Sequence, residues 1–374
     1  MSFAFSFSGD DIDEAQVQAD ASIPSQSAET TAAAVAAAPS TSSSAFPVAG
    51  KPLLPAVRHD LKHMLSALPS KVAFSTLDVQ LDGGDVIKLP RRELWDVRLQ
   101  LMAEEEDGGE AEPGLGSHDV KTGVYEGGFK SWESSVDLVK VLEKSSQSLW
   151  TSQDEVPCVI ELGCGTALPS LALFQWAISA RRATGPRPLS IILADYNSTV
   201  LQLVTLPNFV LSWALQHAAD SPLLMAAFEA VEGELELTPE VLQAFEEFLA
   251  AQQISLQFLS GGWSDEFVEI VKAAQALPNV ANQKQRMVVL GAETIYSPFA
   301  LQAFTETIFA LMRHSQSTGS TAEVFAAAKR LYFGVGGSLD DFILKSRELG
   351  ATVEQLREET EGVRRGVVKC YLKA

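Results

Sequence analysis

The order of apolar and polar positions along the chain predicts alternating strands and helices. Short continuous apolar runs predict buried strands at residues 158–162, 189–194, 254–259, 287–291, 330–335 and 367–372. Apolar residues spaced three and four apart predict helices at residues 132–142, 169–180, 199–213, 298–312 and 339–349. This alternation is typical of an α/β fold with a doubly wound sheet, whose ligand crevice lies at the carboxyl ends of the strands. We also expect an antiparallel hairpin near the C-terminus.

The N-terminal third carries weaker periodicity and predicts a small accessory layer. Residues 60–68 have helical apolar spacing, and residues 71–77 are expected to form a short strand. Residues 20–46 are mostly Ala, Ser, Thr and Pro without an apolar face, so we expect a disordered linker there. In the aromatic and acidic segment 1–19, the alternation of Phe3, Phe5 and Phe7 fits an edge strand and a loose chain equally well.

An acidic, glycine-rich stretch at residues 104–119 is expected to be a solvated loop that separates the accessory layer from the core. The predicted organisation is therefore a segment 1–19, a linker 20–46, an accessory region 47–120 and a main domain 121–374.

Composition narrows the class of partner and the compartment. Of 374 residues 46% are hydrophobic, and 28 basic against 48 acidic residues give a net charge of −20. That charge argues against binding a nucleic-acid backbone and is compatible with a basic partner. The chain has only three cysteines, no secretion signal and, from its sequence, no stretch long enough to span a bilayer. We expect an intracellular protein with no membrane contact. The five histidines are scattered without metal-site spacing, so we expect no metal.

The strongest chemical signal is a buried strand that runs into a glycine loop, VPCVIELGCGTALP, at residues 156–169. Gly163 and Gly165 let the backbone approach a ligand closely, and the amides at the following helix start favour polar groups. Leu168 stands at the third glycine position of the dinucleotide fingerprint, and Glu161 precedes the loop. An acid there repels a pyrophosphate but suits the cationic amino-acid end of S-adenosylmethionine. The alternative is a purely structural turn.

Three further residues support a cofactor crevice. Asp195 ends the next predicted strand, where it is placed to accept both ribose hydroxyls, although a turn or capping aspartate is the alternative. Its distance from Gly165 exceeds the roughly twenty residues typical of such a unit, which we attribute to a loop insertion at residues 181–188. Trp132 and Trp263 follow glycine-rich or polar turns, so each either stacks on the adenine or fills the core.

A second motif, ETIYSP, follows the predicted strand at residues 287–291. Glu293 and Tyr296 would place a carboxylate and a hydroxyl above the same crevice, where a substrate enters. Each is equally compatible with a helix-start role.

Taken together, these motifs resemble the histidine protein methyltransferases of eukaryotes, within the seven-strand S-adenosylmethionine-dependent group. The resemblance runs through ELGCGTALPSL, ADYNSTVL, TLPN, ETIYSP and AAKRLYFGVGGS in order, preceded by GGFKSWESSVDLV, and extends to the N-terminal region. It implies a Rossmann-like seven-strand sheet and S-adenosylmethionine as cofactor. It also implies a substrate histidine, methylated at its tele nitrogen, in the third protein of the large ribosomal subunit, and a location in cytoplasm and nucleus.

The chain departs from this family in three places, one of which is the loop insertion at residues 181–188. Gly261, Gly262 and Trp263 stand where related sequences have glycine, aspartate and tryptophan, and residues 223–251 resemble an extended insertion. The predicted catalytic residues are Glu293 and Tyr296; the predicted cofactor-binding residues are Trp132, Glu161, Gly163, Cys164, Gly165, Asp195, Asn197 and Trp263. Rival hypotheses are a protein lysine methyltransferase and a non-catalytic cofactor-binding assembly factor, with a dehydrogenase below both.

Overall fold

The computed structural model describes residues 53–106, 120–121, 125–126, 128–152, 154–229, 231–275, 284–332 and 336–373. The predicted aromatic segment 1–19, the linker 20–46 and most of the acidic loop lie outside these residues.

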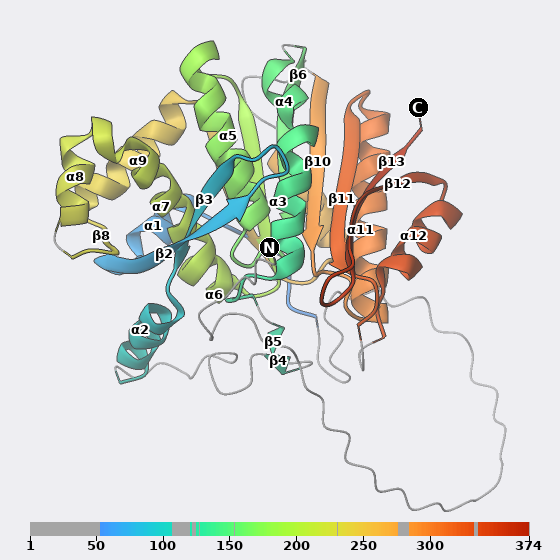
Figure 1. Ribbon diagram of the computed structural model, residues 1–374, viewed down its shortest axis with the longest axis horizontal. Helices are drawn as coiled ribbons and strands as arrows, with labels where there is room; N and C mark the ends of the chain where they lie inside the picture. Colours follow the sequence, from blue (N-terminus) through green and yellow to red (C-terminus); the bar gives the residue numbers. More distant parts are fainter. Residues whose placement is uncertain are drawn as a thin grey trace, which may run out of the picture.

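A mixed eight-stranded sheet forms the centre of the protein (Figure 1). Its strands, in spatial order, are β1 (Val57–His59), β9 (Ile254–Ser260), β7 (Leu189–Asp195), β6 (Glu155–Leu162), β10 (Lys284–Ala292), β11 (Thr321–Lys329), β13 (Arg365–Leu372) and β12 (Ala351–Glu359). The five strands from β9 to β11 are parallel, whereas β1, β13 and β12 pair antiparallel. The α/β fold and the C-terminal hairpin are therefore confirmed.

Helices cover both faces of the sheet because alternate residues of each strand point to opposite sides. One face packs on α3 (Glu133–Ser145), α5 (Leu168–Thr184) and α7 (Leu206–His217), and the other on α10 (Asp265–Gln275), α11 (Pro298–Ser317) and α12 (Leu339–Glu348). On β6, for example, Val159 belongs to the first core and Ile160 to the second. A run of apolar residues without alternation is therefore the pattern of a strand buried on both faces.

The accessory region is joined to the core more closely than its sequence suggests. Its β1 extends the central sheet, while β2 (Lys71–Gln80) and β3 (Val86–Arg92) pair with β8 (Glu234–Glu236) in a three-stranded sheet. The supposed insertion at residues 223–251 thus contributes a strand to that sheet, flanked by α8 (Pro222–Glu229) and α9 (Pro239–Ala251). The remaining elements of the described residues are α1 (Leu61–Ser66), α2 (Leu94–Glu106), α4 (Gln147–Thr151), α6 (Ser198–Val200), a π-helical turn (Leu201–Thr205), a 3-10 helix (Ala218–Asp220), β4 (Val120–Lys121) and β5 (Tyr125–Glu126).

Two predictions of local structure were wrong, and the expectation that no stretch is long enough to span a bilayer also needs correction. The strand predicted at residues 330–335 is displaced, because β11 is the alanine-rich run Thr321–Lys329 and residues 330–332 begin a loop. The loop insertion at 181–188 is half helical, since α5 continues to Thr184. One helix, at residues 198–220, is long and apolar enough to cross a membrane, but 78% of its apolar window is buried, as expected for a core helix.

Candidate active site

The glycine loop lies where the strand order changes direction, which is where ligands bind in doubly wound sheets. From β6 the next strand along the chain, β7, lies on one side, and β10 lies on the other. Gly163 has φ +63° and Gly165 has φ +51°. A Cβ on Gly163 would lie 2.8 Å from Cγ2 of Thr294, and one on Gly165 would lie 2.9 Å from the Gly128 carbonyl oxygen. Both positions therefore exclude side chains.

Ala167 is the third left-handed residue of this loop, with φ +58°, and it was missed by the comparison with the dinucleotide fingerprint. That comparison assigned the third glycine position to Leu168, the first residue of α5. A non-glycine residue in this conformation costs on the order of 1 kcal/mol, and such strain persists only where the surroundings enforce it. The residue type gave no signal for this position, because alanine disfavours the left-handed region.

Two buried carboxylates flank the glycine loop. Glu161 accepts a hydrogen bond at Oε2 from the Ser170 amide at 3.0 Å, and Asp195 accepts from the amides of Gly165 at 3.0 Å and Asn197 at 3.1 Å. Burial raises the pKa of Glu161 to about 8, with the Asp195 charge adding to this, and burial raises the pKa of Asp195 to about 6. Within the described ranges neither forms an ion pair with a basic side chain.

This donor set fits S-adenosylmethionine. Buried acids without a cationic partner are stabilised by a ligand that brings positive charge, and the cofactor carries both an ammonium and a sulfonium. The two glycines of the loop, Gly163 and Gly165, have no side chains, so the backbone can closely approach the amino-acid end of the cofactor. The residues that would hold the cofactor are thus Glu161, Asp195 and the loop between Gly163 and Gly165.

The other predicted cofactor residues take several positions. The Cys164 thiol is buried 3.9 Å from Oγ1 of Thr205, and its amide donates to the Ala194 carbonyl, so its side chain faces the core. Asn197 directly precedes α6 (Ser198–Val200), and its backbone amide donates a hydrogen bond to the Asp195 carboxylate. Trp263 packs on Phe304 in the core with ring centroids 5.8 Å apart, yet its edge lies 3.8 Å from the Cβ position of Gly163.

Glu293 lies directly after β10 in a left-handed conformation, with φ +58°. Its two carboxylate oxygens accept hydrogen bonds from different elements, one from the Ser134 hydroxyl of α3 and one from the Tyr332 hydroxyl. Burial raises the pKa of Glu293, while these hydroxyls, Lys329 and Arg365 oppose that shift. Sequence reasoning missed Ser134 and Tyr332 as partners, because nothing local connects residues that are 159 and 39 positions away from Glu293.

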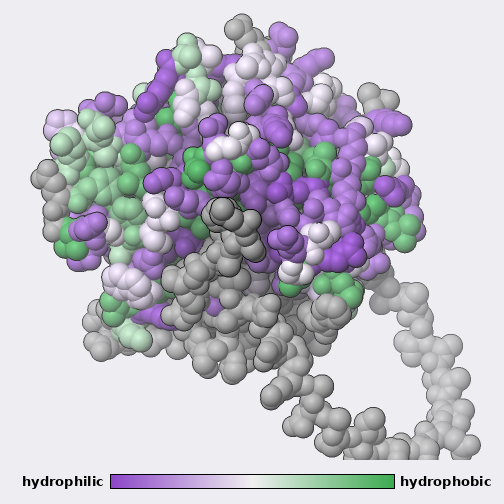
Figure 2. All heavy atoms as spheres, in the orientation of Figure 1, coloured by the Kyte–Doolittle hydropathy of each residue, from purple (hydrophilic) through white to green (hydrophobic). Residues whose placement is uncertain are grey.

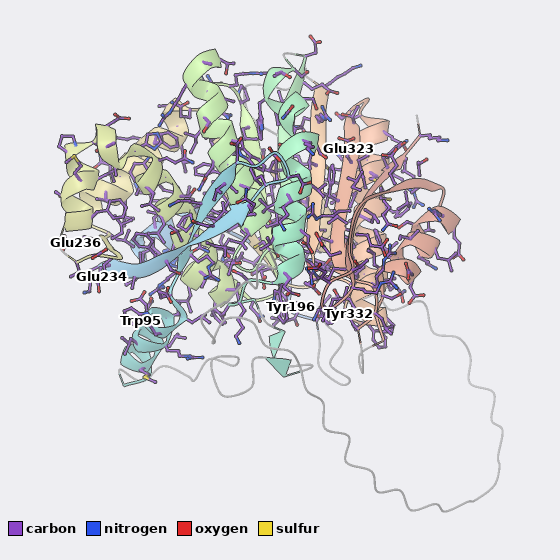
Figure 3. All side chains as sticks on the ribbon, viewed as in Figure 1. Trp95, Tyr196, Glu234, Glu236, Glu323 and Tyr332 are labelled. Carbon is purple, nitrogen blue, oxygen red and sulfur yellow. The ribbon has the colours of Figure 1, made fainter. Side chains whose placement is uncertain are left out.

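A cation lies beside this carboxylate. The Lys329 ammonium stands 5.7 Å from the Trp132 ring centroid and 5.9 Å from that of Tyr332. Trp132, at the start of α3, therefore faces Lys329, the last residue of β11. Burial, followed by the neighbouring Glu293 charge, raises the pKa of Tyr332 well above its ordinary value, so it stays a donor. Figure 3 shows Tyr332 and Tyr196 at the same end of the sheet.

Tyr296 lies on the same loop as Glu293 but is placed differently. It is half-buried against the second core, and its carbonyl accepts from the Gly337 amide at 3.1 Å. A Cβ on Gly337 would overlap the backbone of Ile295 and Tyr296, so the loop after β11 is held tightly against the ETIYSP loop. Glu293 and Tyr296 therefore share the loop that follows β10, and their catalytic role stays a prediction.

Gly261 and Gly262, where this chain differs from related sequences, are in close contact with the start of the accessory region. Gly261 has φ +106°, and a Cβ on Gly262 would overlap the Leu53 side chain. The Gly262 amide also donates to the Leu54 carbonyl at 3.0 Å. Leu53 therefore occupies the space that an acidic side chain at position 262 would need.

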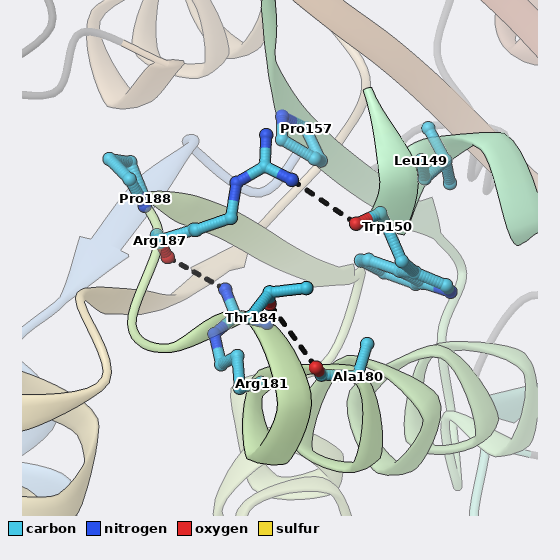
Figure 4. Close-up of a pocket in the computed structure, with 8 residues that line it drawn as sticks. All are labelled: Leu149, Trp150, Pro157, Ala180, Arg181, Thr184, Arg187 and Pro188. Atoms are coloured by element: carbon cyan, nitrogen blue, oxygen red, sulfur yellow. Dashed lines mark hydrogen bonds between the residues drawn. The ribbon is translucent and has the colours of Figure 1, made fainter. Parts of the chain in front are cut away.

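A small pocket at the other end of the sheet is not part of this site (Figure 4). It has a volume of about 10 Å³ and lies between α4, the end of α5 and Pro157 near the start of β6. Arg187 crosses it to donate to the Trp150 carbonyl at 3.1 Å. Its place at the amino end of β6 separates it from the crevice.

The fold and site define the class. A parallel β9-β7-β6-β10-β11 sheet completed by an antiparallel β13 and the edge strand β12 is the arrangement of the seven-strand methyltransferases. With a bare glycine loop after β6 and acids at the ends of β6 and β7, the protein is an S-adenosylmethionine-dependent methyltransferase.

Comparison with known proteins specifies the family. The chain is 33% identical to Histidine protein methyltransferase 1 of Saccharomyces cerevisiae, covering 91% of this chain and 89% of that protein. It is 31% identical to the Schizosaccharomyces pombe protein of the same name, covering 82% and 83%. The chain belongs to the histidine protein methyltransferase family.

Other comparisons add less. No family model matches the chain. Among solved structures, a magnesium protoporphyrin IX methyltransferase from Synechocystis PCC 6803 is 9% identical with a TM-score of 0.30, covering 64% of this chain and 83% of that one. A putative class I S-adenosylmethionine-dependent methyltransferase from Listeria monocytogenes is 14% identical with a TM-score of 0.32, covering 75% and 69%. The assignment rests on the sequence relatives and the strand order.

Proposed function

We propose that this enzyme transfers a methyl group from S-adenosylmethionine to the tele nitrogen of a histidine in the third protein of the large ribosomal subunit. Membership of the histidine protein methyltransferase family supports histidine as the acceptor. The net charge of −20 supports a basic partner, and ribosomal proteins are basic. The three cysteines are all buried free thiols, which supports a reducing compartment, the cytoplasm or nucleus.

Methyl transfer to a histidine does not require a strong general base. A neutral imidazole, with a pKa of about 6.5, is already nucleophilic at cytosolic pH. The bound cofactor would supply the electrophilic methyl group. The protein's own tasks are to align the imidazole, exclude water and select the tautomer whose target nitrogen carries no proton.

The observation that carries the proposal is the Glu293 carboxylate, held from two sides at the end of β10. Ser134 and Tyr332 fix its orientation, since each of its oxygens accepts one of their hydroxyl hydrogen bonds. In this position Glu293 accepts a hydrogen bond from the pros N–H of the substrate, which leaves the tele nitrogen free to attack. It also stabilises the positive charge that develops on the ring as the bond between sulfur and the methyl group breaks and S-adenosylhomocysteine leaves. The methylated imidazolium then passes its pros proton to the Glu293 carboxylate, from which it reaches solvent. Tyr296, on the same loop, borders the entering substrate.

The test compares Glu293→Gln and Tyr296→Phe with Glu323→Gln as the matched control. Glu323 lies near the amino end of β11, paired with Arg286 and Lys369, and is labelled in Figure 3. A hydrogen bond to a charged group contributes about 1.5 to 3 kcal/mol, so we expect turnover to fall about 10- to 100-fold in Glu293→Gln and to stay near normal in the control. Full turnover in both Glu293→Gln and Tyr296→Phe, with Gly163→Arg inactive, would exclude the assigned role.

Two readouts separate the rival functions. Amino-acid analysis of the modified protein distinguishes methylhistidine from methyllysine, and methyllysine would contradict the proposal. Calorimetry with S-adenosylmethionine tests the non-catalytic hypothesis: tight binding without any methylated product would favour an assembly factor.

A further inference from the structure

Helix α2 presents a stripe of large apolar side chains to solvent. Trp95, Leu99 and Met102 are 49%, 57% and 59% exposed. At about 100° per residue they lie within roughly 60° of one another around the helix, whereas the buried Val97 and Leu101 lie on the opposite side. Figure 2 shows apolar side chains over α2 at the lower left of the molecule. An exposed cluster of this kind marks an interaction site more often than isolated apolar residues do.

The buried face of α2 fixes this stripe next to the crevice. Val97 and Leu101 pack with Val200, Leu203 and Val204, on the helix that follows Asp195. Arg92, at the end of β3, donates from Nη1 to the Leu203 carbonyl at 2.9 Å. Figures 1 and 3 place α2 and Trp95 at the same end of the molecule as α6, the end where the strands of the sheet terminate. The stripe is therefore both rigid and close to the site of methyl transfer.

The charge of α2 indicates the chemistry of its partner. In sequence the helix holds three consecutive glutamates, 104–106, and one basic residue, Arg98, while Asp96 is paired with Arg92 at 2.7 Å. Those glutamates occupy the last turn, which holds no basic residue, and the helix macrodipole makes that end negative as well. A cationic partner would relieve this accumulated negative charge. Together with the net charge of −20, this fits a basic protein that also offers apolar side chains.

We propose that the outer face of α2 is the docking surface for the basic substrate protein, separate from the crevice that receives its target histidine. This inference rests on the proposed function, because it assumes that the substrate is a basic protein. Trp95, Leu99 and Met102 bury apolar side chains of the substrate, and the negative charge that the helix carries in sequence attracts its lysines and arginines. Docking at α2 raises the affinity for the intact substrate without taking part in methyl transfer.

The test uses Leu99→Ser with Leu344→Ser as a matched control. Both leucines are helical and similarly exposed, at 57% and 59%, but Leu344 lies on α12. With the unmethylated third protein of the large ribosomal subunit as substrate, we expect KM to rise about 10-fold or more in Leu99→Ser. The kcat and the affinity for S-adenosylmethionine remain at wild-type values, and Leu344→Ser behaves as the wild type. Trp95→Ser should reproduce the KM effect.

Two results would overturn the docking surface. One is an equal KM for the Leu99→Ser and Leu344→Ser variants. The other is a wild-type dimer that Leu99→Ser converts to a monomer in sedimentation, with unchanged turnover, which would make α2 a contact between two copies of this chain. A wild-type enzyme that does not methylate this substrate would instead contradict the proposed function, and a salt-dependent binding measurement between the two proteins would then test the surface directly.

Discussion

Replacing Glu161 with glutamine should make the cofactor-free protein more stable at alkaline pH while weakening cofactor binding. The side chain is 2% exposed, and its carboxylate is held by the Ser170 amide but by no basic group among the described residues. Glutamine keeps an oxygen for that amide and carries no charge. The substitution therefore removes the cost of ionising a buried acid without opening a cavity.

The magnitude follows from the pKa. The pKa of Glu161 lies at about 8 in the folded protein against 4.5 for the free side chain. Because the folded-state value is the higher one, the stability it confers is complete below pH 4.5 and is lost as the pH rises to about 8. Each pKa unit corresponds to about 1.4 kcal/mol, so the wild type should lose about 2 to 3 kcal/mol between pH 6 and pH 8 that Glu161→Gln retains. Asp195, with a pKa of about 6, titrates mostly below this window and is present in both proteins.

Urea unfolding of both proteins at pH 6 and pH 8, without cofactor, measures this difference directly. A difference in unfolding free energy between variant and wild type that is the same at both pH values would contradict this prediction. Calorimetry tests the effect on cofactor binding. Binding to the wild type at pH 7 should release protons as Glu161 ionises, so the measured heat of binding should depend on the ionisation enthalpy of the buffer. The variant should bind more weakly and show less proton release.

Three further predictions concern packing and orientation. Gly262→Asp should lower thermal stability in a melting experiment, since the new side chain overlaps Leu53, and Gly262→Ala should do so less. Arg365→Met should cost about 3 kcal/mol in urea unfolding because it leaves the buried Asp137 without its ion-pair partner at 2.8 Å; an unchanged midpoint would show that the pair contributes nothing. Tyr332→Phe should lower kcat about tenfold with cofactor affinity intact, since a hydrogen bond to a charged group contributes about 1.5 to 3 kcal/mol; an equal loss of cofactor binding would point to a structural role.

Much of the central domain was predictable because its signals are local. The strands β6, β7 and β10 each contain a continuous apolar run, which is the pattern expected of a strand buried on both faces. Glycine in a left-handed turn and an acid at a strand end are also local requirements, so the loop at Gly163 and Gly165 and the acids Glu161 and Asp195 were found before any tertiary contact was known. The parallel order then placed these residues at one edge.

The position of β11 was not predicted because its own residues favour a helix. Its sequence, TAEVFAAAK, has high helix propensity, and the neighbouring RLYFGV has the aromatic and β-branched residues typical of strands. Pairing with β10 on one side and β13 on the other overrides the propensity of the alanines, which give the flat, small surface that α3 and α11 pack against. Tertiary context decided the position of this strand.

The sequence by itself thus determined the fold class, the glycine loop and the acids beside it, because each depends on periodicity or backbone conformation within a few residues. Only the tertiary structure decided which hydroxyls hold Glu293, that Leu53 fills the space beside Gly262, and that β8 completes the sheet of β2. Those contacts join residues far apart in the chain. Their energies depend on distance and burial in three dimensions, which no local pattern of residues encodes.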